Sequence, residues 1–106
     1  MQNIVVEYNL SAIQNLMQKH RIKKGYLFGS SVKGNFGKDS DIDVLVVVPE
    51  GTHRRHTSQQ IHMNLFGFEY PVDVIVATKA DLEKHKDNPG LIYRNILKEG
   101  KKVYAA

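Results

Sequence analysis

Three of the eleven acidic residues lie in or beside the two most apolar stretches of the sequence. Asp41 and Asp43 open the run that ends at Val48, and Asp73 follows thirty residues after Asp43, within a second run of valine and isoleucine. Alternate side chains of a strand point to the same face. We therefore expect Asp41 and Asp43 to share a face, with Cα atoms about 6.8 Å apart.

Carboxylates within apolar strands are expected to bind a cation. An ionised carboxylate within an apolar strand is costly unless it is paired or bound to metal, and a second like charge nearby adds to the cost. Neither strand contains a Lys or Arg. If the strands that carry Asp43 and Asp73 are neighbours, their oxygens converge on one or two hard cations. Mg²⁺ is the expected ion, because it binds through a few carboxylates and the phosphates of a substrate.

A Gly-Ser pair precedes the first two aspartates and adds an anion site. Gly29 and Ser30 follow the short apolar segment Tyr26–Phe28, and ten residues separate Ser30 from Asp41. Glycine lets the backbone approach a ligand closely, N–H groups at the start of a following helix face an anion, and the Ser30 hydroxyl adds a donor. Neither the Gly-Ser pair nor the aspartate pair is specific by itself. Together they indicate a phosphate cradle that faces a metal pair, as in-line phosphoryl or nucleotidyl transfer requires.

Helical and strand patterns alternate along the chain, which predicts an α/β or α+β fold with a small mixed sheet flanked by helices. Asn9 or Ser11 is the expected cap of the first helix, Ile42–Val48 is the strongest strand, and a helix near the C-terminus is expected to turn Ile92, Ile96 and Leu97 inward. The expected strands are Tyr26–Phe28, Ile42–Val48, Tyr70–Val76 and Lys102–Tyr104, and Ile4–Val6 is expected to be an edge strand or an arm. The expected helices begin near residues 10, 52, 78 and 88.

Composition narrows the class of protein. The chain has 106 residues, 42% of them hydrophobic and 25% charged, which predicts one folded domain over residues 1–106. It has no cysteine, so disulfides, Cys-based zinc sites and a Cys nucleophile are excluded. Neither a secretory signal nor a membrane-spanning run is evident, and the expected location is the cytoplasm. The net charge of +4 fits a nucleotide, a nucleic acid, an acidic partner or simply a soluble surface.

The segment from Tyr26 through Gly29, Ser30 and Gly34 to Asp41–Val46 resembles the signature of the DNA polymerase β-like nucleotidyltransferase superfamily. The short chain is similar to the minimal nucleotidyltransferase (MNT) family, over roughly residues 10 to 104. The resemblance implies the nucleotidyltransferase fold and an enzyme that uses a nucleoside triphosphate, ATP by analogy, with two Mg²⁺ ions. Such an enzyme transfers the nucleoside monophosphate to a hydroxyl and releases pyrophosphate.

The resemblance also implies roles for individual residues. Gly29 and Ser30 would hold the triphosphate, Asp41 and Asp43 would bind both metals, and Asp73 would complete the metal site and help deprotonate the acceptor. Related sequences often carry Arg directly after Gly-Ser and a second basic residue two positions later. Here Ser31 and Lys33 occupy those positions, so Lys33 can reach a phosphate only as a point charge.

A chain this short lacks the extra helical domains of larger nucleotidyltransferases, so we expect a second copy or a different protein to complete it. The resemblance implies a small helical HEPN-type protein, with this chain as the antitoxin that adds AMP to a tyrosine of that partner. The alternative is a non-catalytic module that binds nucleotide or masks its partner. A nucleic-acid substrate is not favoured, because the sequence lacks an aromatic and basic stacking surface.

Two other groups of residues could bind a ligand or a metal. The basic segment 52–56 is either a solvated helix start or a contact for phosphate, acceptor or an acidic partner. His53, His56 and His62 do not have the spacing of a metal set.

Overall fold

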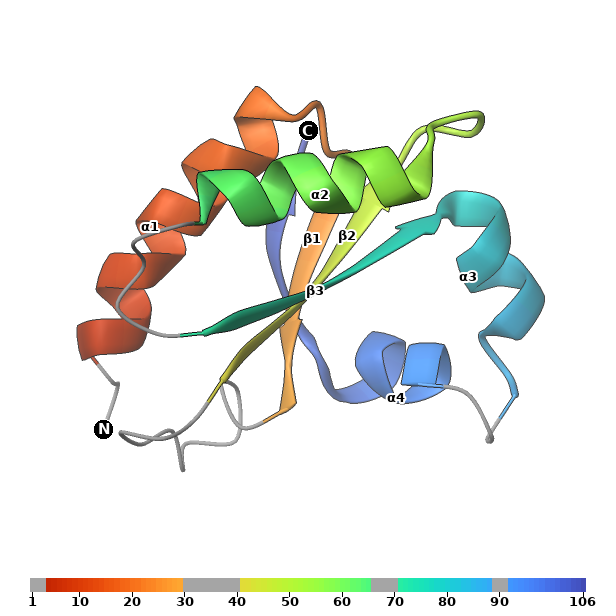
Figure 1. Cartoon of the computed structure of the whole chain (residues 1–106). Helices are drawn as coiled ribbons and strands as arrows, with labels where there is room; N and C mark the ends of the chain where they lie inside the picture. The colour runs from red at the N-terminus through yellow and green to blue at the C-terminus, as the bar shows by residue number, and fades with distance from the viewer. Residues whose placement is uncertain (1–3, 30–40, 66–70, 89–91) are drawn as a thin grey trace.

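The computed structural model describes residues 4–29, 41–65, 71–88 and 92–106, with residues 4–10 described by their backbone alone. In this part of the chain, helices and strands alternate around one sheet (Figure 1). The elements are α1 (Ile4–Lys19), β1 (Lys24–Phe28), β2 (Ile42–Val48), α2 (Arg54–Asn64), β3 (Val72–Thr78), α3 (Lys79–His85), α4 (Ile92–Glu99) and β4 (Lys101–Ala105).

The sheet is mixed, with strand order β3-β2-β1-β4. β1 pairs antiparallel with both β2 and β4, whereas β2 and β3 run parallel and are connected through α2. The N–H of Ile42 donates to the carbonyl of Pro71 over 2.9 Å, so the parallel pairing is fixed where both strands begin. The predicted small mixed sheet flanked by helices is confirmed.

Helices cover both faces of the sheet (Figure 1). On one face α1 and α2 bury Met17 and Ile61 against alternate residues of β2, including Val44 and Val46. The opposite face carries a smaller cluster, in which α3 and α4 pack on Leu45, Val47 and Ala77 through Leu82 and Ile96. β2 is buried over nearly its whole length, as its continuous run of apolar residues predicted.

The first helix differs from the sequence prediction. Ile4–Val6 was expected to form a strand with a helix cap at Asn9 or Ser11, but α1 already begins at Ile4. β-branched residues lower helix propensity only slightly, and strand propensity depends strongly on context, so three of them do not prevent a helix that packs on the sheet.

The last helix buries less than expected. Ile96 is buried, but Ile92 and Leu97 are 45% and 38% exposed, so the prediction that they join the core is wrong. α4 has eight residues and reaches the sheet mainly through one turn, which leaves its other apolar residues at the margins. Gly100 ends the helix, and a Cβ there would lie 3.0 Å from the carbonyl oxygen of Leu27.

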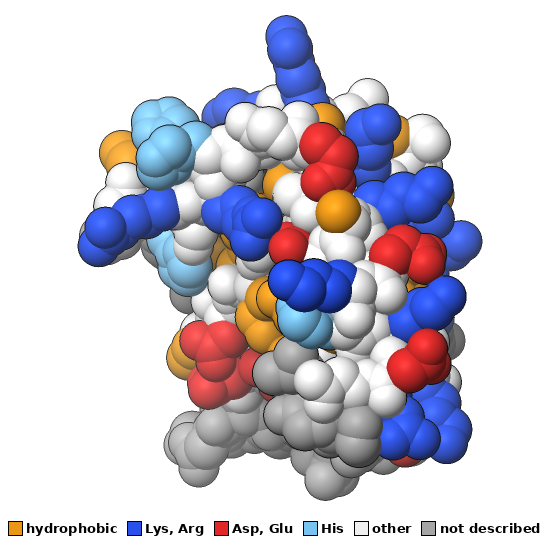
Figure 2. Space-filling view, turned by 90° about the vertical axis from the view of Figure 1, so that its right-hand side faces the viewer, with side chains coloured by type: hydrophobic (Ala, Val, Ile, Leu, Met, Phe, Trp, Pro, Cys, Tyr) orange, Lys and Arg blue, Asp and Glu red, His pale blue; other side chains and the backbone are white. Residues whose placement is uncertain are grey.

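Surface charge is dispersed on the face shown in Figure 2, where Lys and Arg side chains lie among acidic and histidine side chains. Within the described residues, no helix is both long and apolar enough to cross a membrane.

A capping box joins β3 to α3. The Asp81 N–H donates to Thr78 Oγ1 over 3.2 Å, and the Thr78 N–H donates to the Asp81 carboxylate over 2.9 Å. The sequence predicted this pattern from the residue types alone. The Thr78 backbone hydrogen bond, with help from the Thr78 hydroxyl and Arg54, holds the pKa of Asp81 below its ordinary value of 3.8.

We expect Asp81→Asn to lower the free energy of unfolding at pH 7 by about 1 kcal/mol, as loss of a cap does. Because the folded-state pKa is depressed, this contribution is full above pH 3.8 and is lost as the pH falls through the folded pKa. Urea unfolding at pH 7 and pH 3 measures the change. Glu83→Gln on the same helix is the matched control, because its exposed pair with Lys86 contributes little. Equal effects of the two variants would contradict the prediction.

Candidate active site

Asp43 and Asp73 lie side by side on neighbouring strands. The parallel register of β2 and β3 pairs them directly, and the antiparallel register of β1 and β2 places Phe28 opposite Asp43. Paired residues of neighbouring strands project to the same face of a sheet. Asp43 also shares its face with Leu45 by alternation, so these side chains belong to the face that α3 and α4 cover.

Gly29 brings the backbone against this carboxylate pair. It follows β1 with φ of +67°, a conformation that side chains rarely adopt, and a Cβ at this position would collide with Asp43 Oδ2 and lie 3.4 Å from Asp43 Cγ. Glycine is therefore required here for two reasons, its positive φ and the close approach of the Asp43 carboxylate. The role of Gly29 beside a ligand stays a prediction.

The site is electrostatically strained in the direction expected of a cation site. Partial burial, then the charge of Asp73, then that of Asp41 raise the pKa of Asp43 above its ordinary value of 3.8. All three causes penalise the ionised form, and a bound cation would relieve all of them. Asp41 and Asp73 are exposed, whereas Asp43 is half-buried, so the cluster opens to solvent.

The donor set fits magnesium bound together with a phosphate ligand. Among the described residues, no three acidic or histidine side chains are close enough to hold a metal ion by themselves. Mg²⁺ does not need such a cage, because it is held by one or two carboxylates with water and substrate phosphates as the remaining ligands. Asp43 and Asp73 supply two hard oxygen donors on adjacent strands, with Asp41 at the mouth.

The structure places the other sequence-predicted residues less completely. Ser30 and Lys33 lie outside the described residues. The basic segment 52–56 follows the far end of β2, away from Asp43, so it does not join this site. There Arg54 pairs with Asp81 at 3.1 Å, and His53 caps α2 by accepting the His56 N–H.

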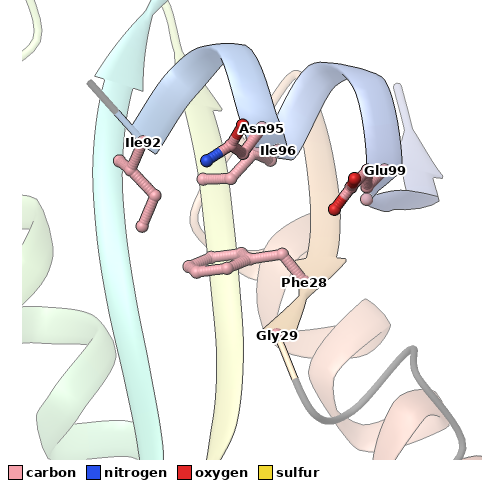
Figure 3. A pocket seen from close by; sticks show the side chains of 7 residues that line it. Phe28, Gly29, Ile92, Asn95, Ile96 and Glu99 are labelled. Atoms are coloured by element: carbon pink, nitrogen blue, oxygen red, sulfur yellow. The ribbon is translucent and has the colours of Figure 1, made fainter. Parts of the chain in front are cut away.

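A cavity of about 200 Å³ lies beside the carboxylates, and no pattern in the sequence predicts it. It lies between the end of β1 and α4, and Phe28, Gly29, Asn95 and Glu99 are among its lining residues (Figure 3). Strand alternation could have placed Phe28 on the face of Asp43. No sequence pattern relates the α4 residues to Asp43, because their proximity depends on how α4 packs on the sheet.

Two comparisons with known proteins bear on this arrangement. The model of the nucleotidyltransferase domain family matches residues 11–103, which is most of the chain. No curated protein sequence matches it.

Solved structures with a similar fold include two toxin–antitoxin structures. A mutant MntA–HepT complex superposes with a TM-score of 0.67 at 16% identity, covering 92% of this chain and 73% of that one. A toxin–antitoxin structure with AMP-PNP gives 0.61 at 21% identity, with 92% and 74% covered. A candidate nucleotidyltransferase from Sulfolobus solfataricus gives 0.57 at 21% identity, with 78% of each chain covered. At these identities the likeness shows a shared fold.

We expect NMR titration of the carboxyl carbons to give Asp43 a pKa above 3.8, and Asp73→Asn to lower that pKa by removing the adjacent charge. A raised folded-state pKa costs stability as the pH rises through it, so Asp43→Asn should increase the free energy of unfolding at pH 7. This advantage should disappear below pH 3.8, where Asp43 is protonated in both states.

Glu50→Gln, just beyond the far end of β2, is the matched control and should leave the pKa of Asp43 unchanged. A pKa of Asp43 at its ordinary value, or one insensitive to Asp73→Asn, would refute the proximity of the two carboxylates.

Proposed function

The chain belongs to the nucleotidyltransferase domain family, and on this premise we propose that it transfers AMP from ATP to a hydroxyl group, with two Mg²⁺ ions bound at the carboxylates. The observation that carries the proposal is the direct pairing of Asp43 with Asp73, with Gly29 held against the Asp43 carboxylate. That arrangement brings an anion-accepting backbone and a cation-accepting carboxylate pair to one point on the sheet.

Each residue then has a distinct role. Asp41, Asp43 and Asp73 would hold the Mg²⁺ ions, and the bound ions would neutralise charge on the triphosphate. Gly29 lets the backbone reach the phosphates, with Ser30 and Lys33 as further phosphate contacts. The acceptor oxygen attacks the α-phosphorus, the bond from that phosphorus to the bridging oxygen breaks, and pyrophosphate leaves. Asp73 accepts the proton of the acceptor hydroxyl.

The identities of the donor and the partner rest on likeness. One structural neighbour was solved with AMP-PNP, an ATP analogue, and two are toxin–antitoxin structures. We therefore propose ATP as the donor and a small helical HEPN-type protein as the partner that carries the acceptor hydroxyl. The solvent-facing carboxylates support a partner, because nothing among the described residues covers Asp41 or Asp73.

We expect calorimetry to show that the chain binds AMP-PNP in the presence of Mg²⁺ and not without it, and that Asp43→Asn abolishes this binding. The variant should also lose AMP transfer by at least about 100-fold, because metal stabilisation of a reacting phosphate is worth several kcal/mol. Release of pyrophosphate from ATP in the presence of the co-expressed partner measures transfer.

Glu50→Gln is the matched control, since it removes one negative charge far from the site and should bind AMP-PNP like the natural chain. Normal transfer by Asp43→Asn would sink the catalytic proposal. Partner binding and neutralisation without any nucleotide binding, in the natural chain and in Asp43→Asn alike, would instead favour the non-catalytic masking module.

The two glycines with positive φ allow a test of the cradle. Gly29 and Gly51 have φ of +67° and +86°, but only Gly29 has Asp43 against it, and a Cβ at Gly51 would meet nothing within 4 Å. Ala at either position should lower stability by about 1 kcal/mol through backbone strain. Only Gly29→Ala should also weaken Mg²⁺-dependent AMP-PNP binding, by tenfold or more. Similar AMP-PNP affinities for the two variants would show that the approach of Gly29 to Asp43 is irrelevant to binding.

A further inference from the structure

The lining and the volume of the cavity beside the carboxylates indicate what kind of ligand it can hold. One side is formed by Phe28 and Gly29 at the end of β1, and the other by Ile92, Asn95, Ile96 and Glu99, all from α4 (Figure 3). Its volume of about 200 Å³ is below the roughly 300–1,000 Å³ of pockets that enclose a whole drug-sized ligand. The cavity therefore suits one planar part of a larger ligand.

The lining excludes phosphate as the occupant. No Lys or Arg is among the lining residues, and the one charged side chain is the carboxylate of Glu99. Phe28 is half-buried, while Ile92 is 45% exposed and is one of the few large apolar side chains left open to solvent. An aromatic ring and two isoleucines are the surroundings in which a flat, uncharged ring system stacks favourably.

The position ties the cavity to the nucleotide. Gly29 lines the cavity and also touches the Asp43 carboxylate. Phe28, directly before it, is the cross-strand partner of Asp43 on the same face. A molecule whose phosphates lie at Gly29 and Asp43 therefore has its nearest sheltered apolar surface in this cavity.

We propose that this cavity is the subsite for the base of the donor nucleotide, that it accepts adenine against Phe28, and that Asn95 reads the edge of the base. This inference rests on the proposed function, since it assumes a nucleotide at the carboxylates. No hydrogen bond or ion pair joins the side chain of Asn95 or of Glu99 to another described residue, so both side chains are available to a ligand.

The polar groups select adenine by their donors and acceptors. The Asn95 amide offers one donor and one acceptor together, which matches the N7 acceptor and N6 amino donor of adenine. The same edge of guanine offers two acceptors, which Arg or Lys would read and which Glu99 would repel. A tyrosine acceptor fits less well, because its only polar group is the reacting hydroxyl, which must lie at the α-phosphorus and not beside Asn95.

The test compares the affinities of three Mg²⁺-loaded ligands for the full chain by calorimetry: AMP-PNP, GMP-PNP and inorganic tripolyphosphate. We expect the natural chain to bind AMP-PNP more tightly than the other two. Asn95→Ala should weaken AMP-PNP about tenfold, the order expected from loss of a paired hydrogen-bond edge, and should reduce the preference over GMP-PNP. Its affinity for tripolyphosphate should not change.

Glu99→Ala gives a sharper test. Removing this negative charge relieves electrostatic repulsion, so by that effect alone the variant would bind every polyanion more tightly. Weaker AMP-PNP binding with equal or tighter tripolyphosphate binding identifies a contact with the base. Leu97→Ala is the matched control on the same helix, since Leu97 is 38% exposed and does not line the cavity. Phe28→Leu should weaken AMP-PNP about tenfold through loss of stacking.

The outcomes separate this inference from the function on which it rests. If Asp43→Asn abolishes AMP-PNP binding while Asn95→Ala and Glu99→Ala bind it normally, the function stands and the base subsite is overturned. If N-acetyl-tyrosinamide shifts the NMR signals of Phe28 and Asn95 and adenosine does not, the cavity holds the acceptor and the inference is again overturned. If the natural chain binds none of the three ligands, both proposals fail.

Discussion

The arrangement of the site depends on one electrostatic constraint. Two carboxylates of like charge are paired directly where two parallel, largely apolar strands begin. Asp43 and Asp73 are neighbours in the sheet, and the pKa of Asp43 is raised by burial and by the charges around it. Folding alone gains nothing from this contact, because replacing either aspartate by an uncharged residue would remove a repulsion. In the proposed function, a bound cation with its polyanionic ligand would offset this repulsion, which folding alone does not.

The other residues of the two strands are almost all apolar, and their packing in the core offsets this repulsion. Beyond Asp43, β2 is buried to its end at Val48, and its alternate residues supply both core clusters. Helices on both faces of the sheet thus stabilise the register of β2 and β3 by packing on the parts of these strands that lie beyond the carboxylates. α4 contributes least to this core, since of its large apolar residues only Ile96 is buried. The rest of its inner surface is consequently free to line the cavity beside Asp43.

Much of this was predictable from local patterns. The continuous apolar run of β2 and the Thr78–Asp81 capping box follow from residue types alone, because each is decided within a few neighbouring residues. The first helix was missed because the strand preference of Ile4–Val6 yields to its setting in α1. The cavity was missed for a different reason, since Asn95 and Phe28 are far apart in sequence and meet only through the packing of α4. The roles of Asp41, Asp43 and Asp73 remain predictions, while the proximity of Asp43 to Asp73 follows from the strand register.

The register of β2 and β3 links core packing to the chemistry of the site. Side chains alternate with a period of two, so a slip of one residue between these strands would move Asp73 to the opposite face from Asp43. The same slip would move Val72, Val74 and Val76 to the face covered by α3 and α4, and would move Ile75 and Ala77 to the face covered by α1 and α2. Apart from Asp73 and its last residue, β3 is apolar on both faces, so the slipped pairing is disfavoured by the misfit of exchanged side chains in the two clusters and by loss of the Ile42–Pro71 hydrogen bond. The hydrophobic core need not contact a ligand to influence where the carboxylates lie, because the side chains of β2 and β3 pack into its two clusters in the register that pairs Asp43 with Asp73.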